Sequence, residues 1–185
     1  MQSLDTALFQ MITAGPDAPG WLVMLATFLA SAVVPLVGAG LLLAWVLGRG
    51  RLALLDAVAA ALLGLGAVQV IGAVSYRPRP FELGQGLNLM QHLPENSFPS
   101  DHATLMFALA ASLAMSGRRV GRVLFLLGAA VGWGRVYLGA HWPLDILGGL
   151  VLGLVSAALV RRVPQRMALW GLAERLYQRL VPFRT

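Results

Sequence analysis

The chain has 185 residues, of which 58% are hydrophobic and only 12% are charged, and it contains no cysteine. Soluble domains average about 25% charged residues, so this composition indicates an integral membrane protein, and it excludes disulfide and thiol chemistry. The formal net charge of +6 comes from fourteen basic residues, all of them arginine. Because these arginines gather in short loops between apolar segments, we expect the partner to be a membrane and not a nucleic acid.

Apolar segments, taken in chain order, predict an all-α integral membrane helical bundle. Residues 1–20 lack the basic leader of a signal peptide, and we expect them to form a short interfacial helix. Five transmembrane spans are expected after it, with a kink at Pro35 in the first of them: residues 21–47, 52–75, 102–116, 123–140 and 146–160. The interfacial helix and the five spans make a six-helix core in a single domain, 1–163, and residues 164–185 are predicted to be a cytoplasmic amphipathic tail.

The arginines also predict which way the chain faces. Only Arg77, Arg79 and Arg135 fall on one side of the predicted membrane, which leaves eleven of the fourteen on the other. Cytoplasmic loops carry an excess of basic residues, so we expect the eleven in the cytoplasm and the three on the outer face.

Two G-x-x-x-G pairs occur in predicted spans, at Gly128 with Gly132 and at Gly149 with Gly153. Small residues at this spacing let two membrane helices approach closely. We interpret both pairs as helix-packing sites and not as ligand sites.

Polar residues in three predicted spans reach a similar depth. Counted from the inner arginines at about 1.5 Å per residue, His102, Arg135 and Asp145 lie about 20–24 Å along their helices. The loop formed by residues 76–101 starts at the outer interface and can fold back over them. One composite pocket near the outer face is the simplest interpretation.

The basic and hydroxyl residues of this pocket indicate an anion as ligand. Arg77, Arg79 and Arg135 converge without enough carboxylates to neutralise them, and guanidinium groups bind phosphate oxygens in bidentate fashion. Ser100 precedes His102 at a helix start, where free N–H groups and the helix dipole favour an anion. Ser97 and Ser100 also fit simple N-caps, and we interpret Ser100 as the phosphate contact.

The histidines supply the reactive groups. His141 and Asp145 are four residues apart, so on a helix their side chains would touch, and the carboxylate would fix the imidazole tautomer. The other ring nitrogen of His141 is then free to attack phosphorus, and His102 is left as the proton donor for the leaving group. This arrangement predicts phosphoryl transfer through a phosphohistidine. His92 lies in the polar loop, and we interpret it as an ordinary solvated histidine.

Three motifs in the chain resemble those of the type 2 phosphatidic acid phosphatase superfamily, which read K-x6-R-P, P-S-G-H and S-R-x5-H-x3-D. Eight of the eleven motif positions match, in the right order and spacing: Arg79, Pro80, Pro99, Ser100, His102, Arg135, His141 and Asp145. Within the superfamily, the chain is most similar to the bacitracin-resistance branch of undecaprenyl-diphosphate phosphatases, through the strings R-P-R-P-F, S-F-P-S-D-H-A-T and R-V-Y-L-G-A-H-W-P-L-D.

The resemblance implies a metal-independent enzyme without a cofactor that hydrolyses undecaprenyl diphosphate, the peptidoglycan carrier lipid, to undecaprenyl phosphate. It implies a bacterial inner-membrane location with the active site facing the periplasm. Its catalytic residues would be His141, His102 and Asp145, and its phosphate contacts would be Arg79, Ser100 and Arg135.

Three motif positions depart from the superfamily pattern. Gly72 stands at the lysine position, Asp101 at the motif glycine and Gly134 at the motif serine. Asp101 adds a negative charge near the expected phosphate. Because the chain contains no lysine, we hypothesise that Arg77 supplies the missing positive charge.

Other readings of the same residues remain open. Within the family, these are a phosphatidate or phosphatidylglycerophosphate phosphatase and a lipid A phosphotransferase. A metallohydrolase that uses His102, His141 and Asp145 as ligands is disfavoured, because the neighbouring arginines would repel a divalent cation. A soluble vanadate-dependent peroxidase conflicts with the apolar spans, and an anion transporter conflicts with the off-centre polar cluster and the absence of an internal repeat. The oligomeric state is left open.

Overall fold

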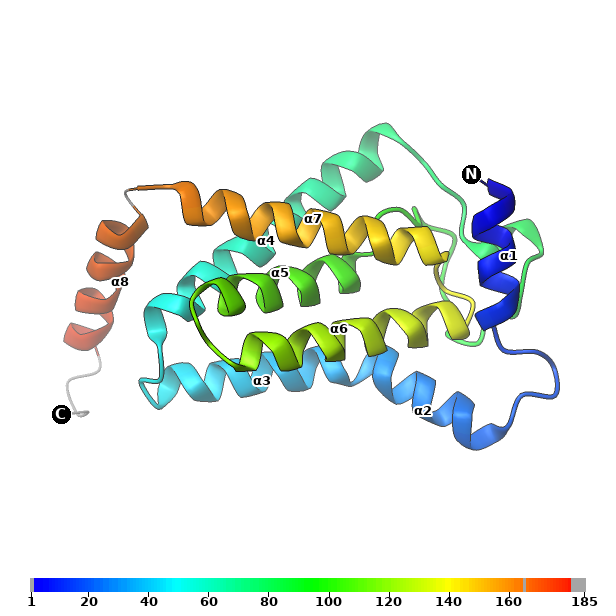
Figure 1. The fold of residues 1–185 in the computed structure, drawn as a ribbon, viewed down its shortest axis with the longest axis horizontal. Coiled ribbons are helices and arrows are strands. Elements are labelled where there is room, and N and C mark those ends of the chain that lie inside the picture. The colour runs from blue at the N-terminus through cyan, green and yellow to red at the C-terminus, as the bar shows by residue number, and fades with distance from the viewer. Residues whose placement is uncertain (1, 165, 181–185) are drawn as a thin grey trace.

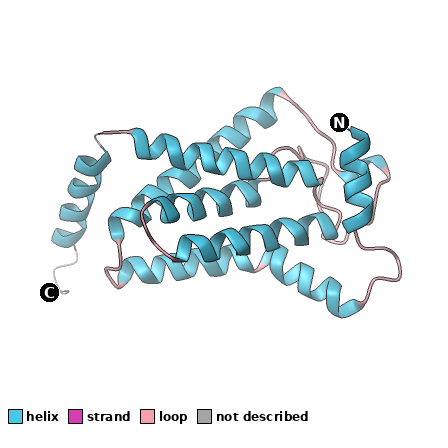
Figure 2. Ribbon diagram, viewed as in Figure 1, coloured by secondary structure: helices cyan, strands magenta, loops and turns pink. Residues whose placement is uncertain are grey.

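In the computed structural model, the described residues, 2–164 and 166–180, form helices joined by loops and contain no strand (Figures 1 and 2). The helices are α1 (Gln2–Ile12), α2 (Gly20–Ser31), α3 (Val33–Val46), α4 (Arg51–Val74), the 3-10 helix η1 (Pro80–Leu83), α5 (Asp101–Met115), α6 (Val120–Tyr137), α7 (Pro143–Arg162) and α8 (Arg166–Leu180). The all-α prediction is confirmed, and the predicted boundaries of α4, α6 and α7 hold within three residues.

Helix α5 lies at the centre of the bundle and packs against α4, α6 and α7 (Figure 1). Most of its side chains between Ala103 and Leu113 are buried, and many of them are alanines, which allow close helix contacts. By length and composition, α4, α6 and α7 can each cross a membrane, and α2 with α3 adds a fourth crossing if the bent pair is one span. The remaining predicted span, α5, has only 15 residues, which is fewer than the roughly 20 that a membrane-crossing helix needs.

The first predicted span, 21–47, is not one straight helix. It is broken at Ala32 into α2 and α3, and the two halves are bent by 43°. Pro35 explains the break, because a proline ring clashes with the carbonyl group four residues earlier, and here that residue is Ser31, the last of α2. The kink was therefore predicted correctly, and it falls one turn before the proline.

The short helices α1 and α8 cross opposite ends of the bundle (Figure 1). In α1, Phe9 is fully buried against Trp142, with ring centroids 5.1 Å apart, whereas Leu4 is 62% exposed. Of the apolar residues expected to face the membrane interface, Leu4 is exposed, whereas Phe9 packs into the bundle. Helix α8 confirms a helical segment within the predicted tail, and Trp170 ties it to α4 through a 2.8 Å hydrogen bond from its indole N–H to Asp56. Residues 165 and 181–185 of that tail lie outside the described residues.

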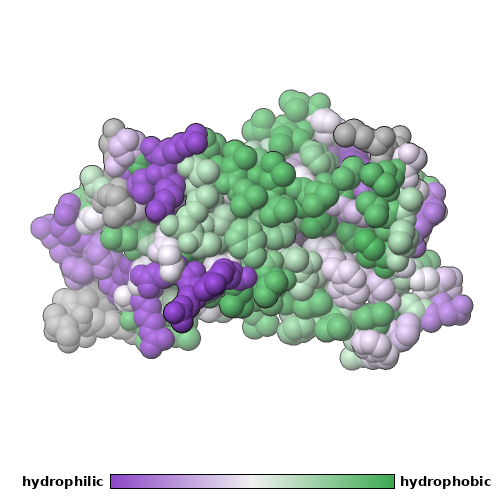
Figure 3. Space-filling view, viewed as in Figure 1, coloured by the Kyte–Doolittle hydropathy of each residue, from purple (hydrophilic) through white to green (hydrophobic). Residues whose placement is uncertain are grey.

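The exposed surface suits a membrane. In the space-filling view, hydrophobic side chains cover the middle of the molecule, and hydrophilic ones gather most densely at the end that carries α8 (Figure 3). Leu62, Val70 and Leu126 are each at least 65% exposed. Apolar side chains exposed all round a bundle of this length indicate a lipid-facing surface.

Close helix contacts in the core depend on the predicted glycine pairs. A Cβ atom on Gly149 would lie 2.7 Å from Ala103 Cβ, and one on Gly153 would lie 2.7 Å from the backbone nitrogen of Ala108. Both positions join α7 to α5. On α6, a Cβ atom at Gly132 would lie 2.5 Å from a methyl carbon of Ile146. The interpretation of these glycines as packing sites is confirmed.

Gly153→Ala should destabilise the protein although alanine favours helix. The added methyl group meets the backbone of α5, which cannot give way as a flexible side chain would, and overpacking of this kind costs about 1–3 kcal/mol. Gly66→Ala is the matched control, because a Cβ atom there has nothing within 4 Å. Thermal unfolding in detergent should show a lower Tm for Gly153→Ala only, and equal Tm values for the two variants would contradict the packing role.

Candidate active site

The helix ends that carry the residues predicted to form one pocket lie at the end of the bundle that α1 crosses (Figure 1). His102 is in the first turn of α5, Arg135 in the last turn of α6 and Asp145 in the first turn of α7. Arg79 precedes η1 in the loop after α4, and His141 lies in the short connection between α6 and α7. The similar depth expected from helix rise is therefore found in the structure.

His141 is 1% exposed, and both of its ring nitrogens have polar neighbours. Nδ1 lies 3.0 Å from the carbonyl oxygen of Ser97, which can only accept, so Nδ1 carries the hydrogen. The unprotonated Nε2 lies 3.4 Å from Arg79 Nη1. Burial lowers the pKa of His141 and outweighs the opposing effect of Asp145. A neutral imidazole with its Nε2 lone pair oriented by the protein is suited to nucleophilic attack.

The predicted contact between His141 and Asp145 is present, but it does not follow a helical turn. Helix α7 begins at Pro143, so His141 precedes the helix, and its Nδ1 lies 3.5 Å from Asp145 Oδ2. That oxygen also accepts hydrogen bonds from the backbone N–H of Trp142 at 2.8 Å and from the hydroxyl of Ser97 at 2.5 Å. Asp145 therefore caps α7, and the shortest bond that fixes the His141 tautomer comes from the Ser97 carbonyl.

Arg77 is bound by two buried carboxylates. Its Nη1 donates to Asp145 Oδ1 at 2.6 Å, and its Nη2 forms an ion pair with Asp5 of α1. Asp5 is 1% exposed and was not predicted as a site residue. The sequence indicates it only through its spacing, because Asp5 lies four residues before Phe9 and so shares the buried face of α1. These contacts give Arg77 two carboxylate partners in place of the expected phosphate, and its role as a substitute for the motif lysine stays a prediction.

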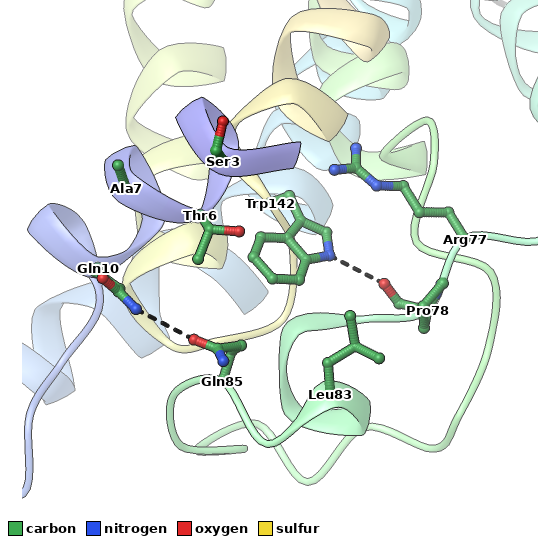
Figure 4. Close-up of a pocket in the computed structure, with 9 residues that line it drawn as sticks. All are labelled: Ser3, Thr6, Ala7, Gln10, Arg77, Pro78, Leu83, Gln85 and Trp142. Atoms are coloured by element: carbon green, nitrogen blue, oxygen red, sulfur yellow. Dashed lines mark hydrogen bonds between the residues drawn. The ribbon is translucent and has the colours of Figure 1, made fainter. Parts of the chain in front are cut away.

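Two separate cavities confirm that Arg77 and Arg79 face different ways. Arg77 and Trp142 line a cavity of about 430 Å³ between α1 and the loop, where the indole N–H donates to the carbonyl of Pro78 at 3.0 Å (Figure 4). Arg79 and His141 line a different cavity, of about 450 Å³. Its polar walls make the second cavity the candidate catalytic pocket.

The guanidinium groups of Arg79 and Arg135 are buried, and among the described residues neither has a close ion pair with a buried carboxylate. The two residues are 5% and 3% exposed, and the Nε of each has no hydrogen-bond partner among the described residues. Glu95, the acidic neighbour of Arg79, is 3.9 Å away and its side chain is 65% exposed. Buried charges are costly unless they are paired. Two such groups beside the predicted nucleophile indicate a site for an anion such as phosphate.

His102 is oriented by its own neighbour in the chain. Its Nδ1 lies 2.8 Å from Asp101 Oδ1, and its Nε2 contacts Arg135. Asp101 stands at the motif glycine, where we expected only an added negative charge near the phosphate. In the structure, the Asp101 carboxylate contacts His102 and so fixes the ring of the predicted proton donor.

The two serines differ from each other in role. Ser100 is the N-cap of α5, and its hydroxyl accepts from the backbone N–H of Ala103 at 3.5 Å. Ser97 is no cap, because its hydroxyl donates to Asp145. Capping does not prevent Ser100 from contacting a phosphate, and that contact stays a prediction.

The interpretation of His92 as a solvated histidine is wrong. Its ring is half-buried, and Nε2 lies 3.0 Å from Arg135 Nη1. The 43 residues between the two positions explain why no spacing rule indicated this contact.

The two remaining motif departures have packing explanations. Gly72 lines the catalytic pocket, where a Cβ atom would lie 3.1 Å from Asn96 Nδ2, so the side chain of Asn96 occupies the space next to the motif lysine position. Gly134 faces α2, and a Cβ atom there would lie 2.8 Å from the carbonyl oxygen of Ala26. A serine at Gly134 would push α2 away from α6.

Possible metal ligands do not gather in this pocket. Within 2–164 and 166–180, no three histidine or acidic side chains are grouped so that they could hold a metal ion. Asp145, a ligand in the metallohydrolase alternative, lies on the Nδ1 side of His141, away from the Nε2 that approaches Arg79.

Known proteins are similar to this chain in sequence and in fold. YbjG of Escherichia coli (strain K12), named as a candidate undecaprenyl-diphosphatase, is 36% identical over 97% of this chain and 90% of its own length. The undecaprenyl-diphosphatase BcrC of Bacillus subtilis (strain 168) is 31% identical over 76% of this chain and 75% of its own. The crystal structure of Aquifex aeolicus LpxE has the same fold, with a TM-score of 0.75 and 24% identity over 86% of this chain and 95% of that one.

The family assignment follows from the match over the catalytic segment itself. The profile of the PAP2 superfamily matches residues 53–168, which run from α4 through the pocket residues to α8. This range contains Arg79, His102, Arg135, His141 and Asp145 in the order of the superfamily motifs. The chain therefore belongs to the PAP2 superfamily, whose motif residues it brings to one end of a membrane-embedded helical bundle.

Proposed function

We propose that this membrane protein hydrolyses undecaprenyl diphosphate to undecaprenyl phosphate and inorganic phosphate. The observation that carries the proposal is the pair of buried guanidinium groups of Arg79 and Arg135, whose Nε atoms have no hydrogen-bond partner among the described residues, near the Nε2 of His141. A diphosphate lipid carries more negative charge than a phosphate monoester and so uses such a site more fully. The similarity to BcrC over three quarters of both chains supports the choice of lipid.

The reaction proceeds in two displacements. His141 Nε2 attacks the terminal phosphorus, an N–P bond forms, and the P–O bond to the lipid phosphate breaks. Protonated His102 gives its Nε2 proton to the departing oxygen, and protonation also ends its contact with Arg135, because two donors repel each other. Water then attacks the phosphohistidine, His102 takes a proton from that water, and phosphate leaves. Arg79, Arg135 and Ser100 bind the phosphoryl oxygens, whereas Arg77 holds Asp145.

A route for the lipid tail continues along α4 from the catalytic pocket. A third cavity, of about 560 Å³, has apolar walls from α3, α4 and α5, and Leu65 and Leu105 are among its lining residues. Leu65 lies two turns from Gly72, which lines the catalytic pocket. A prenyl chain whose phosphates occupy the pocket can follow this apolar surface into the bilayer.

The placement in the membrane follows the arginine asymmetry. We infer a bacterial inner-membrane protein with α5 as a short fifth span, α1 at the outer interface and the site open to the periplasm. At about 1.5 Å per residue α5 is about 22 Å long, so its histidine end is recessed below the outer surface of a roughly 30 Å core. Residues 1–163 form the catalytic domain, and 164–185 form a cytoplasmic tail.

A panel of pure lipids in detergent tests the proposed function. The wild-type protein should release phosphate from undecaprenyl diphosphate with the highest kcat/KM of the panel and should keep its full rate in EDTA. His141→Ala protein, purified in parallel, measures contaminating phosphatase. Loss of the rate in EDTA with recovery in zinc or magnesium would contradict the metal-free mechanism. Preference for phosphatidate or phosphatidylglycerophosphate, or transfer of phosphate to lipid A, would select the alternatives within the family, and no turnover of any lipid would favour an anion transporter.

A further inference from the structure

The loop between η1 and α5 carries a third histidine into the site and holds it firmly. The side chain of Asn88 bonds both backbone groups of His92: Oδ1 accepts from its N–H at 3.0 Å, and Nδ2 donates to its carbonyl at 2.9 Å. The backbone N–H of Leu89 donates to the carbonyl of Leu138, just after α6, at 3.3 Å. These bonds fix the position of His92 relative to the end of α6.

The imidazole of His92 shares one guanidinium with the predicted proton donor. Arg135 Nη1 lies 3.0 Å from His92 Nε2, and Nη2 of the same group contacts His102. Arginine only donates, so His92 Nε2 accepts and the hydrogen of the neutral ring is on Nδ1. The Nδ1–H of His92, which diverges from the Nε2 that faces Arg135, is then a further N–H donor on this loop.

Burial, aided by the charged groups around it, keeps the ring of His92 neutral. Burial lowers the pKa of His92 to about 4, and the positive charges of Arg79 and Arg135, together with the other two site histidines, act in the same direction. At neutral pH the ring is a hydrogen-bond donor without a charge of its own. It binds an anion without adding to the repulsion within the site.

The geometry of the displacement assigns a side of the pocket to His92. In an in-line reaction the nucleophile and the leaving group lie on opposite sides of phosphorus. His141 lies against Arg79, whereas His102 and His92 both lie against Arg135. The proposed mechanism puts His102 on the leaving-group side, and His92, which shares the guanidinium of Arg135 with it, is assigned to the same side.

We infer that His92 is a specificity-determining residue that binds the lipid-linked phosphate, the leaving group, of a diphosphate substrate. A monophosphate ester has only its ester oxygen and an apolar chain at that place, so it gives the Nδ1–H of His92 nothing to bind. The inference rests on the proposed function, since it supposes a diphosphate lipid. It distinguishes a diphosphatase from a monoester phosphatase with the same motif residues.

Farnesyl diphosphate and farnesyl phosphate form the matched pair that tests this role, because they differ only in the second phosphate. His92→Ala should lower kcat/KM on the diphosphate at least tenfold and should leave kcat/KM on the monophosphate within threefold of wild type. His92→Gln should recover most of the loss, because its amide can accept from Arg135 and donate to phosphate. Leu93→Ala, at a 70% exposed position of the same loop, should change neither value.

Each other outcome overturns the inference in a recognisable way. An equal loss on both substrates would mean that His92 only positions Arg135, and an unchanged diphosphate rate would mean that it has no role. Activity on the monophosphate shows that each variant is folded. Wild-type protein that hydrolyses farnesyl phosphate but neither farnesyl nor undecaprenyl diphosphate would refute the proposed function itself, whereas a failure confined to the variants would refute only the role of His92.

Discussion

His141→Ala should abolish turnover of every lipid phosphate. Among the described residues, His141 alone has a ring nitrogen held by the Ser97 carbonyl and another near Arg79, so we expect the variant to have no nucleophile. Removal of the nucleophile from an enzyme with a covalent intermediate costs on the order of 10⁶-fold in kcat. Phosphate release measured against the detergent blank checks the result, and the same variant should form no acid-labile phosphoenzyme with labelled substrate.

His102→Ala is the matched comparison, because it removes the proton donor and keeps the nucleophile. General acid catalysis contributes roughly 10²–10⁴-fold and matters least when the leaving group is good. His102→Ala should therefore still form phosphoenzyme from an activated aryl phosphate while losing nearly all activity on lipids. Vanadate, which mimics the trigonal-bipyramidal intermediate, should inhibit the wild type competitively. Phosphoenzyme in His141→Ala, or total loss on both substrates in His102→Ala, would contradict the assigned roles.

Much of the site could be predicted from the sequence because a helix rises by a constant distance per residue, so residue number gives depth in the membrane. His102, Arg135 and Asp145 end apolar runs of similar length, so counting along each helix was enough to bring them to one level. The assumption of a continuous helix fails at His141. Its four-residue spacing from Asp145 suggested a helical turn, whereas Pro143 at the first position starts the helix later and leaves His141 outside it.

The loop contacts could not be predicted, because no periodicity relates residues on a polar loop to residues on distant helices. The path of this loop is set by side-chain bonds to its own backbone, such as those of Asn88 to His92 and of Asn96 to the N–H of Arg77 and the carbonyl of Phe98. A motif search reads each of these asparagines as an ordinary loop residue. They determine which arginine reaches the phosphate pocket and which binds carboxylates.

Arg77→Ala should be severely impaired in both stability and kcat, for a reason other than a lost phosphate contact. It leaves Asp5 and Asp145, which are 1% and 0% exposed, without the cation that neutralises them. Removing one partner of a buried ion pair costs about 3–5 kcal/mol, because the other charge stays buried and unpaired. The displaced Asp145 no longer supports His141, so kcat should fall while KM changes little. Unfolding in detergent and steady-state kinetics measure the two effects.

The double variant Arg77→Ala with Asp5→Asn separates a positioning role from a phosphate contact. If Arg77 acts through the carboxylates, replacing Asp5 removes one uncompensated charge, so the double variant should regain a large part of the lost Tm and kcat. Arg77→Lys should recover less than the full effect, because one ammonium cannot reproduce the two separate bonds of the guanidinium fork. Arg79→Ala is the internal comparison: it lies in the catalytic pocket, so Asp5→Asn should give it no rescue. If Arg77→Ala instead raises KM and Asp5→Asn gives no rescue, Arg77 turns to the phosphate when substrate binds. If kcat/KM of Arg77→Ala stays within about threefold of wild type, roughly 0.65 kcal/mol, the Asp5–Arg77–Asp145 link is dispensable.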